Sequence, residues 1–261
     1  MSAPATLTRF CRETGETLDL LLQVVLRFGA LWKRRGPIFE QCYMASIKVL
    51  HVVLLVSFFI GMVVSLQTGI ELAAIGQQHQ IGTIVGVSMA REMGPFITAI
   101  VLAATVGSAL AAELGTMAVS DELSALEVMS IDRVSYLVLP RVVAITLMCP
   151  MLAIICNTIG ILGGGFVADA QLNVEYSLYF DSVIEALQAP GRIFPVPKDV
   201  YAGLAKAVVF GITIGAISCS SGLRARGGAL GVGEATRRAV RDSIIAVIIF
   251  NYFMTWLFYQ A

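Results

Sequence analysis

Five stretches of the chain are almost entirely apolar and long enough to cross a membrane. They cover residues 49–70, 81–112, 142–168, 200–221 and 243–259. A membrane-spanning α-helix needs roughly 20 mainly apolar residues, and a segment in lipid must satisfy its backbone hydrogen bonds internally, as a helix does. The pattern therefore predicts an all-α protein with five transmembrane helices, of which the second is long and the last is short.

A sixth apolar stretch, residues 18–32, precedes these five and has a different pattern. It carries Asp19, Gln23 and Arg27 at intervals of four, which draws one polar stripe along a helix. Such a helix is typical of the membrane surface. A secretory signal peptide is the alternative, but acidic residues interrupt its expected basic region and no small-residue cleavage site follows. We therefore expect an N-terminal interfacial helix.

Composition supports a membrane protein that forms one domain. Hydrophobic residues make up 57% of the 261 residues and charged residues only 14%, with a mean hydropathy of +0.82. No internal repeat is evident. We expect a single domain over residues 1–261, with the interfacial region in residues 1–40 and the five-helix core in 41–261. The formal net charge of zero argues against a nucleic-acid partner, which would normally require a basic surface.

The positions of lysine and arginine predict the orientation, because cytoplasmic loops are enriched in both. With a cytoplasmic N-terminus and a C-terminus on the opposite side, only Arg192 and Lys198 lie outside. The cytoplasmic side then collects the remaining basic residues that lie between or before the spans: Arg9, Arg12, Arg27, Lys33, Arg34, Arg35, Lys48, Arg133, Arg141, Arg224, Arg226, Arg237, Arg238 and Arg241. Residues 107–132 and a loop over 222–242 become cytoplasmic. Residues 169–199 become external, as an ordered loop or a short interfacial helix.

Motifs for bond chemistry or metal binding are missing from the sequence. It contains no GxxxxGK[ST] phosphate loop, no HExxH and no GxSxG. The five cysteines form no CxxC pair, and two histidines are too few for a multi-histidine centre. We expect a protein that is not an enzyme, with no metal site and no cofactor of its own.

Three charged residues interrupt the predicted spans: Arg91 and Glu92 in the second and Lys206 in the fourth. Each costs roughly 2.5 to 3.5 kcal/mol at the centre of a membrane helix on insertion scales, so they should face protein or a wet cavity. We expect Glu92 to pair with Lys206, leaving Arg91 nearer the interface or a carbonyl group. The charges could mark a substrate route or simply fix helix register. Pro95 should kink the helix just after them.

The acidic segment, residues 107–132, is the clearest candidate for a partner contact. Its apolar residues Val119, Leu123 and Leu126 recur at helical spacing, with acidic residues elsewhere around the helix. Anionic lipid head groups on the cytoplasmic side would repel such a segment. A protein partner is therefore one interpretation, and a short solvated interfacial helix is the other.

Small residues recur four positions apart in several spans, at Gly82 and Gly86, Gly107 and Ala111, Gly160 and Gly164, and Gly211 and Gly215. This spacing lets helices approach closely. It is compatible with a tightly packed bundle or with a homodimer.

The chain resembles the MlaE/YrbE permeases of Mla- and Mce-type lipid ABC transporters. The resemblance runs from about Phe59 to the C-terminus. It is densest in FIGMVVSLQ (residues 59–67), REMGP (91–95), GSALAAELGTM (107–117) and ELSALEVMSID (122–132). It implies a multi-pass permease of the bacterial inner membrane that moves phospholipids or related lipids between that membrane and the outer envelope. The implied partners are a second copy of the chain, a cytoplasmic ABC ATPase dimer that binds ATP and Mg²⁺, a periplasmic ring of MCE proteins, and membrane lipids.

The resemblance also implies roles for individual residues. The substrate cavity would be formed by Glu92, Arg91, Lys206, Asn251, Gln67, Leu72 and Ile75. A coupling helix between the second and third spans, within residues 113–132, would contact the ATPase through Glu113, Asp121, Glu122, Leu123, Leu126, Glu127, Met129 and Asp132.

Some positions depart from the family pattern. Asn251 stands where an acid is expected, and Arg133 stands where a proline is usual. Ala118 and Val106 replace residues expected to be basic or small. Two other functions remain open from the sequence. One is an ion-coupled secondary transporter running on Arg91, Glu92 and Lys206, and the other is a membrane scaffold without transport activity.

Overall fold

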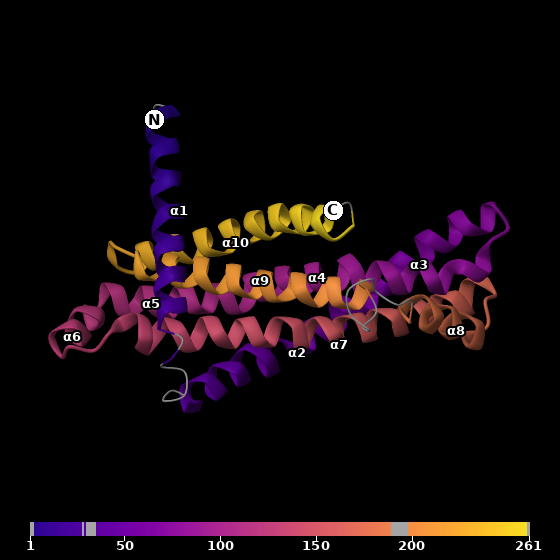
Figure 1. The fold of residues 1–261 in the computed structure, drawn as a ribbon, viewed down its shortest axis with the longest axis horizontal. Helices are drawn as coiled ribbons and strands as arrows, with labels where there is room; N and C mark the ends of the chain where they lie inside the picture. The colour runs from indigo at the N-terminus through magenta and orange to yellow at the C-terminus, as the bar shows by residue number, and fades with distance from the viewer. Residues whose placement is uncertain (1–2, 28, 30–34, 189–197, 260–261) are drawn as a thin grey trace. The chain divides into compact units, whose positions relative to one another are not determined.

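The computed structural model describes residues 3–27, 29, 35–188 and 198–259, and within these it is helical with no strand (Figure 1). The all-α prediction is confirmed. The α-helices are α1 (Ala3–Leu26), α2 (Arg35–Ala74), α3 (Ile81–Ser88), α4 (Gly94–Leu102), α5 (Ser108–Val119), α6 (Glu122–Val128), α7 (Leu139–Leu172), α8 (Tyr176–Leu187), α9 (Lys198–Leu223) and α10 (Gly228–Tyr259). A 3₁₀ turn, η2 (Gln78–Gln80), and three π-helical turns, η3 (Met89–Met93), η4 (Ala103–Gly107) and η5 (Val134–Val138), connect or interrupt them.

Five helices are long and apolar enough to cross a membrane, as predicted. They are Gly36–Ala74, Gln78–Val119, Val134–Leu172, Lys198–Leu223 and Gly228–Tyr259. The second is built from η2, α3, η3, α4, η4 and α5 in succession, so it is continuous but irregular. The protein is therefore a multi-pass membrane protein.

The prediction of a loop over residues 222–242 is wrong. Helix α9 ends at Leu223 and α10 begins at Gly228. The fifth span was predicted to begin at residue 243 because charged residues such as Arg237 and Arg241 precede it. These charged residues lie in the first half of the same helix, α10. The real break is at Gly227 and Gly228, where φ values of 89° and 69° require the left-handed region that glycine adopts without strain.

The described residues form two compact units, which are considered separately. The first unit consists of Met1–Ala45, Leu102–Leu147 and Gly211–Ile248, and the second of Ser46–Val101, Met148–Phe210 and Ile249–Ala261. Helices α2, α7, α9 and α10 contribute residues to both. Helices α1, α5 and α6 belong to the first unit, and α3 and α8 to the second.

Glycines allow close helix packing within each unit. In the second unit, a Cβ on Gly61 of α2 would collide with the backbone of Gly160 on α7, and one on Gly82 would collide with Tyr179 of α8. In the first unit, Gly222 of α9 lies against Ala111 of α5. Several of the predicted small-residue faces are thus occupied by helices of the same chain.

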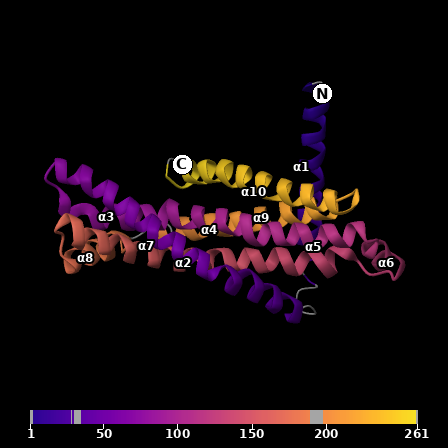
Figure 2. The same cartoon turned by 180° about the vertical axis from the view of Figure 1, so that it is seen from behind.

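The segment between the third and fourth spans contains a helix. Helix α8 packs against α3, and the two views show them side by side (Figures 1 and 2). Tyr179 and Val183 of α8 are buried with Ile81, Val85 and Met89 in one apolar cluster. The short-helix alternative for this segment is confirmed, while Pro190, Pro195 and Pro197 lie outside the described residues.

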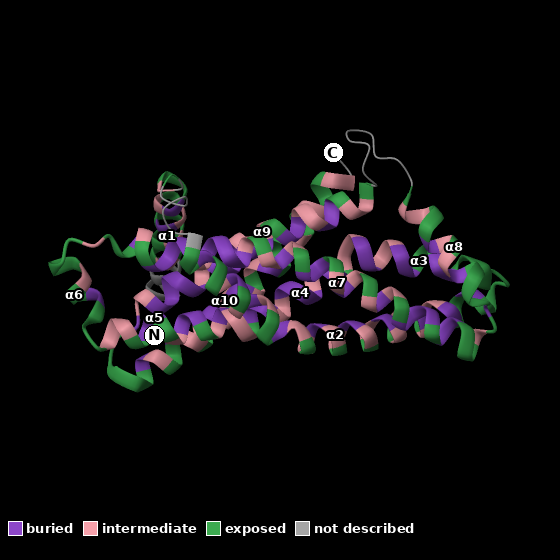
Figure 3. Ribbon diagram, turned by 90° about the horizontal axis from the view of Figure 1, so that it is seen from below, coloured by how far each residue is buried: buried purple, intermediate pink, exposed green. Residues whose placement is uncertain are grey.

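Exposed large apolar residues are most numerous on α2 and α10, and Figure 3 shows the burial of each described residue along these ribbons. Within the most apolar window of each span, only 11% of the residues are buried in Gly228–Tyr259 and 28% in Gly36–Ala74, against 61% in Gln78–Val119. Phe59 on α2 and Phe253 and Trp256 on α10 are among the exposed residues. These two helices therefore offer the largest apolar surfaces to lipid or to another membrane protein.

Candidate functional site

A buried polar network lies in the second unit, centred on Glu92 of η3. The Lys206 ammonium group of α9 donates to Glu92 Oε1 at 2.5 Å and to the Thr255 hydroxyl oxygen of α10 at 2.7 Å. Asn251, one turn before Thr255, donates from Nδ2 to Glu92 Oε2 at 3.1 Å. The predicted pairing of Glu92 with Lys206 is therefore present, and three helices meet in it.

The helix irregularity at η3 supplies a further partner for Lys206. Pro95 has no backbone N–H, so the carbonyl group of Arg91, four residues earlier, loses its helical donor. The Lys206 ammonium group donates to that carbonyl oxygen at 3.3 Å. The side chain of Lys206 has no exposed surface, whereas that of Glu92 is 26% exposed. A buried ammonium group is tolerated because all of its hydrogens have acceptors.

The network is electrically neutral because Asn251 is not an acid. One carboxylate faces one ammonium group, and the amide of Asn251 donates to Glu92 where a second carboxylate would repel it. The centre of the network is thus one ion pair with an amide partner.

Arg91 points to a separate cluster in the same unit. Its guanidinium group pairs with Asp199 at the start of α9, with Nη2 to Oδ1 at 2.9 Å, and lies 4.1 Å over the ring of Tyr259. The Tyr259 hydroxyl donates to the same Asp199 oxygen at 2.7 Å. Sequence reasoning missed Asp199 because it falls just outside the predicted fourth span. It also missed Thr255 and Tyr259, although Asn251, Thr255 and Tyr259 recur every four residues and so share one face of α10.

The remaining predicted cavity residues do not share one environment. Leu72 is buried in the apolar cluster with Ile81 and Tyr179, so it packs in the interior. Gln67 of α2 and Ile75, which follows the end of α2 at Ala74, are exposed. Their assignment to a substrate cavity stays a prediction.

The acidic segment in the first unit is not one helix, contrary to expectation. Helix α5 ends at Val119, and Asp121 adopts φ = 61°, a left-handed conformation that Asp tolerates better than most residues. The short helix α6 follows. Leu123 is buried and anchors α6, while Val128 and Met129 are 87% and 60% exposed. The segment thus presents apolar and acidic side chains to its surroundings.

Two ion pairs attach this segment to other helices. In its α5 part, Glu113 pairs with Arg141 of α7 at 3.1 Å. At its last residue, Asp132 pairs with Arg27, just past α1, at 2.6 Å and also accepts from the backbone N–H groups of Val134 and Ser135 at the start of η5. Of the predicted coupling residues, Glu113 and Asp132 therefore position the segment, and Asp121, Glu122, Glu127 and Met129 are exposed on it.

Helix α1 is attached to the end of α9 and to Arg224, just past it, by further polar contacts. Thr17 donates to the Ser220 hydroxyl oxygen at 3.0 Å, and Glu16 pairs with Arg224 at 3.2 Å. A hydrogen bond from Arg12, together with Arg224, lowers the pKa of Glu16 below its ordinary value. The apolar residues Leu20 and Val24 of α1 are also buried. Of the predicted polar stripe itself, Arg27 makes an intramolecular contact, its ion pair with Asp132.

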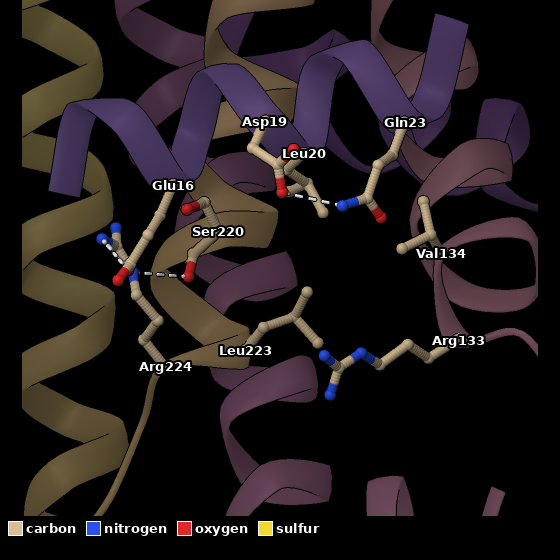
Figure 4. A pocket seen from close by; sticks show the side chains of 9 residues that line it. All are labelled: Glu16, Asp19, Leu20, Gln23, Arg133, Val134, Ser220, Leu223 and Arg224. Atoms are coloured by element: carbon tan, nitrogen blue, oxygen red, sulfur yellow. Dashed lines mark hydrogen bonds and ion pairs between the residues drawn. The ribbon is translucent and has the colours of Figure 1, made fainter. Parts of the chain in front are cut away.

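A pocket of about 200 Å³ remains between α1, the end of α9 and the start of η5 (Figure 4). Its walls carry acidic, basic and apolar side chains: Glu16, Asp19, Leu20, Gln23, Arg133, Val134, Ser220, Leu223 and Arg224. No cluster of three His, Cys, Asp or Glu side chains suited to a metal ion is found in the part of the chain that the structure describes.

Comparison with known proteins finds similar sequences over most of the chain. The family model described as Permease MlaE matches residues 38–257. A probable ABC transporter permease protein of Synechocystis sp. is 38% identical over 85% of this chain and 81% of its own length. The chloroplastic protein Trigalactosyldiacylglycerol 1 of Arabidopsis thaliana is 37% identical over 91% of this chain and 66% of its own. A probable ABC transporter permease protein of Rickettsia bellii is 38% identical over 85% and 83%.

Proposed function

Because the chain belongs to the MlaE permease family, we propose that it moves phospholipids or related lipids between the inner membrane and the outer envelope of a bacterium. Its family makes it a transport subunit and not an enzyme, and its ABC permease relatives imply a separate ATPase partner. ATP and Mg²⁺ would bind to that partner. The lipid substrate, the membrane and the remaining partners are parts of the proposal.

A lipid substrate is supported by the character of the spans and by one relative. The spans are apolar on their exposed faces, and the polar groups around Glu92 are neutralised by their own neighbours. The Arabidopsis relative carries the name of a galactolipid. Acyl chains need an apolar wall with few polar groups, which such spans provide.

The acidic segment is the observation that carries the ATPase contact. Helix α6 is anchored by Leu123 and exposes Val128 at 87% beside the acidic residues Glu122 and Glu127. Met129, the next residue, is 60% exposed, and contiguous exposed apolar residues rimmed by polar ones are typical of a protein contact. We assign α6 as the coupling helix, on the cytoplasmic side with the N-terminus, while the C-terminus is external. A homodimer through the exposed faces of α2 or α10, and an external MCE ring, complete the proposed assembly.

Reconstitution with the partner ATPase tests this function. The permease and ATPase are purified together and ATP-dependent transfer of fluorescent phospholipid out of proteoliposomes is measured. Glu122→Arg together with Asp121→Asn should abolish transfer, because the acidic surface that would face the ATPase is lost, and the protein should still fold because Asn also tolerates the left-handed backbone of position 121. Glu185→Arg on exposed α8 is the matched control and should transfer lipid normally.

Two results would contradict the proposal. Failure of any ATPase to copurify would remove the coupling role of α6. ATP-dependent transport of a water-soluble solute, without lipid transfer, would remove the lipid substrate but leave α6 as the coupling helix.

A further inference from the structure

We propose that the pocket beneath α1 binds the zwitterionic head group of a phospholipid, with the ammonium group toward Asp19 and the phosphate toward Arg133. Both residues line the pocket, and Figure 4 shows Asp19 entering from α1 and Arg133 from the opposite wall. The site concerns a lipid held at the membrane surface. It does not depend on which substrate the spans carry.

One charge that lines the pocket has no ionic partner among the described residues. The charge of Arg224 is paired with Glu16, and its Nε and Nη1 also donate to the Ser220 and Glu13 carbonyl oxygens. Asp19 accepts a hydrogen bond from the Gln23 amide at 2.7 Å, but among the described residues no cation forms an ion pair with it. A carboxylate that lines a pocket without a cation favours a cationic occupant.

Arg133 offers the complementary charge. Its Nη1 pairs with Glu127 at 2.8 Å, and its side chain is 50% exposed. A guanidinium group has five N–H donors in a planar fork, which suits the oxygens of a phosphate group. An occupant that carries a phosphate and an ammonium group therefore matches this pair of walls better than a purely anionic one, which Asp19 and Glu16 would repel.

The position of α1 identifies the source of such a group. The helix exposes Leu18, Leu22, Val25 and Leu26, by 60% or more each, on a multi-pass membrane protein. A helix with an exposed apolar face beside polar residues lies at the head-group level of the bilayer. The pocket adjoins the polar side of the same helix, so phospholipid head groups are its nearest zwitterions. Leu20, Val134 and Leu223 line it as well and can contact the apolar part of the lipid.

Lipid-resolved native mass spectrometry of the full chain tests the site. Binding of phosphatidylethanolamine and of phosphatidylglycerol with the same acyl chains is compared in the unaltered protein and in variants. Asp19→Asn should weaken phosphatidylethanolamine binding about tenfold, the loss of one charge-assisted contact, and should not weaken phosphatidylglycerol binding, because the substitution only removes a repulsion from that anionic lipid. Arg133→Gln should weaken both lipids, because both carry the phosphate.

Controls separate the site from general effects. Glu234→Gln and Arg226→Gln remove exposed charges of the same unit that do not line the pocket, and both should bind each lipid normally. Leu223→Trp fills the pocket without changing its charge and should also weaken phosphatidylethanolamine binding. Unchanged binding in all three pocket variants would overturn the proposal. Displacement of the lipid by soluble phosphoethanolamine at equal concentration would overturn the lipid as the source of the zwitterion.

Discussion

Ion pairs occur in both units of this protein, but in different surroundings. Around Glu92 in the second unit, Lys206 is wholly buried and its charge is balanced by one carboxylate and two neutral acceptors. Around α1 in the first unit, the paired side chains of Arg27, Asp132 and Glu16 are each 36% to 42% exposed. Water and salt screen the exposed ion pairs around α1 and hardly reach the buried Glu92 network.

The two groups of ion pairs therefore contribute differently to the stability of the fold. A buried charge that loses its partner is destabilising by several kcal/mol, whereas an exposed ion pair is worth roughly 0 to 1 kcal/mol. The Glu92 network is therefore a fixed element of the fold, and the contacts of α1 and Asp132 can break and re-form at little cost. The coupling role proposed for the acidic segment requires such weak, reversible contacts.

Removing one member of the buried pair should have the largest effect. Glu92→Ala leaves the Lys206 ammonium group buried without its counter-ion, and the free energy of unfolding should fall by about 3 to 5 kcal/mol. The double variant Glu92→Ala, Lys206→Met removes both charges and should regain much of this loss. Thermal unfolding of the purified protein in detergent measures both. A double variant as unstable as the single one would show that the charges do not stabilise each other.

Converting the amide of the network into an acid should have an intermediate effect. Asn251→Asp replaces a donor 3.1 Å from Glu92 by a second carboxylate, so two acids compete for one lysine. Repulsion is relieved when one of them binds a proton, and we expect a loss of about 1 to 3 kcal/mol in stability. Asn251→Ser, which removes the contact without adding charge, is the control in the same unfolding experiment. Equal stability of the two variants would show that neutrality of the site is unimportant.

The two regions also differ in how far the sequence predicts them. Placing a charge in an apolar membrane span costs free energy unless the charge is paired. Since few other charges lie in the spans, the sequence predicts the pairing of Glu92 with Lys206. Asp199 and Arg27 lie at helix ends, where charges are common, and only the fold brings Asp199 to Arg91 and Arg27 to Asp132. The five spans followed from length and hydropathy, but the start of α10 did not, because its first turns are polar. The break at Asp121 depends on a single backbone conformation that no periodicity reveals.

Breaking the exposed pair between Arg27 and Asp132 should barely affect stability. Arg27→Asp should lower the free energy of unfolding by less than about 1 kcal/mol, yet it removes the ion pair that joins α1 to the end of the acidic segment. We expect ATP hydrolysis by the partner to continue with less lipid transferred per ATP. The charge-conserving variant Arg27→Lys, which leaves the backbone contacts of Asp132 in place, should retain the ratio. An equal loss in Arg27→Lys and Arg27→Asp would show that the charge of the ion pair is unimportant for coupling.

The smallest effect concerns pH and the attachment of α1. The pKa of Glu16 is lowered by the hydrogen bond from Arg12 and by Arg224, so the folded state favours the ionised carboxylate. The contribution of ionised Glu16 to the stability of the folded state is fully present above the ordinary carboxyl pKa. It is lost as the pH falls through the lowered pKa of Glu16, below about pH 5. Spin labels at the exposed positions Leu22 and Leu230, both in the first unit, report the distance between α1 and the start of α10. The distance should be constant near neutral pH and should broaden in acid. Glu16→Gln should show the broad distribution at every pH, because an amide cannot form the ion pair with Arg224. If the distance changes neither with pH nor in Glu16→Gln, the buried apolar residues Leu20 and Val24, and not the ion pairs, hold α1 in place.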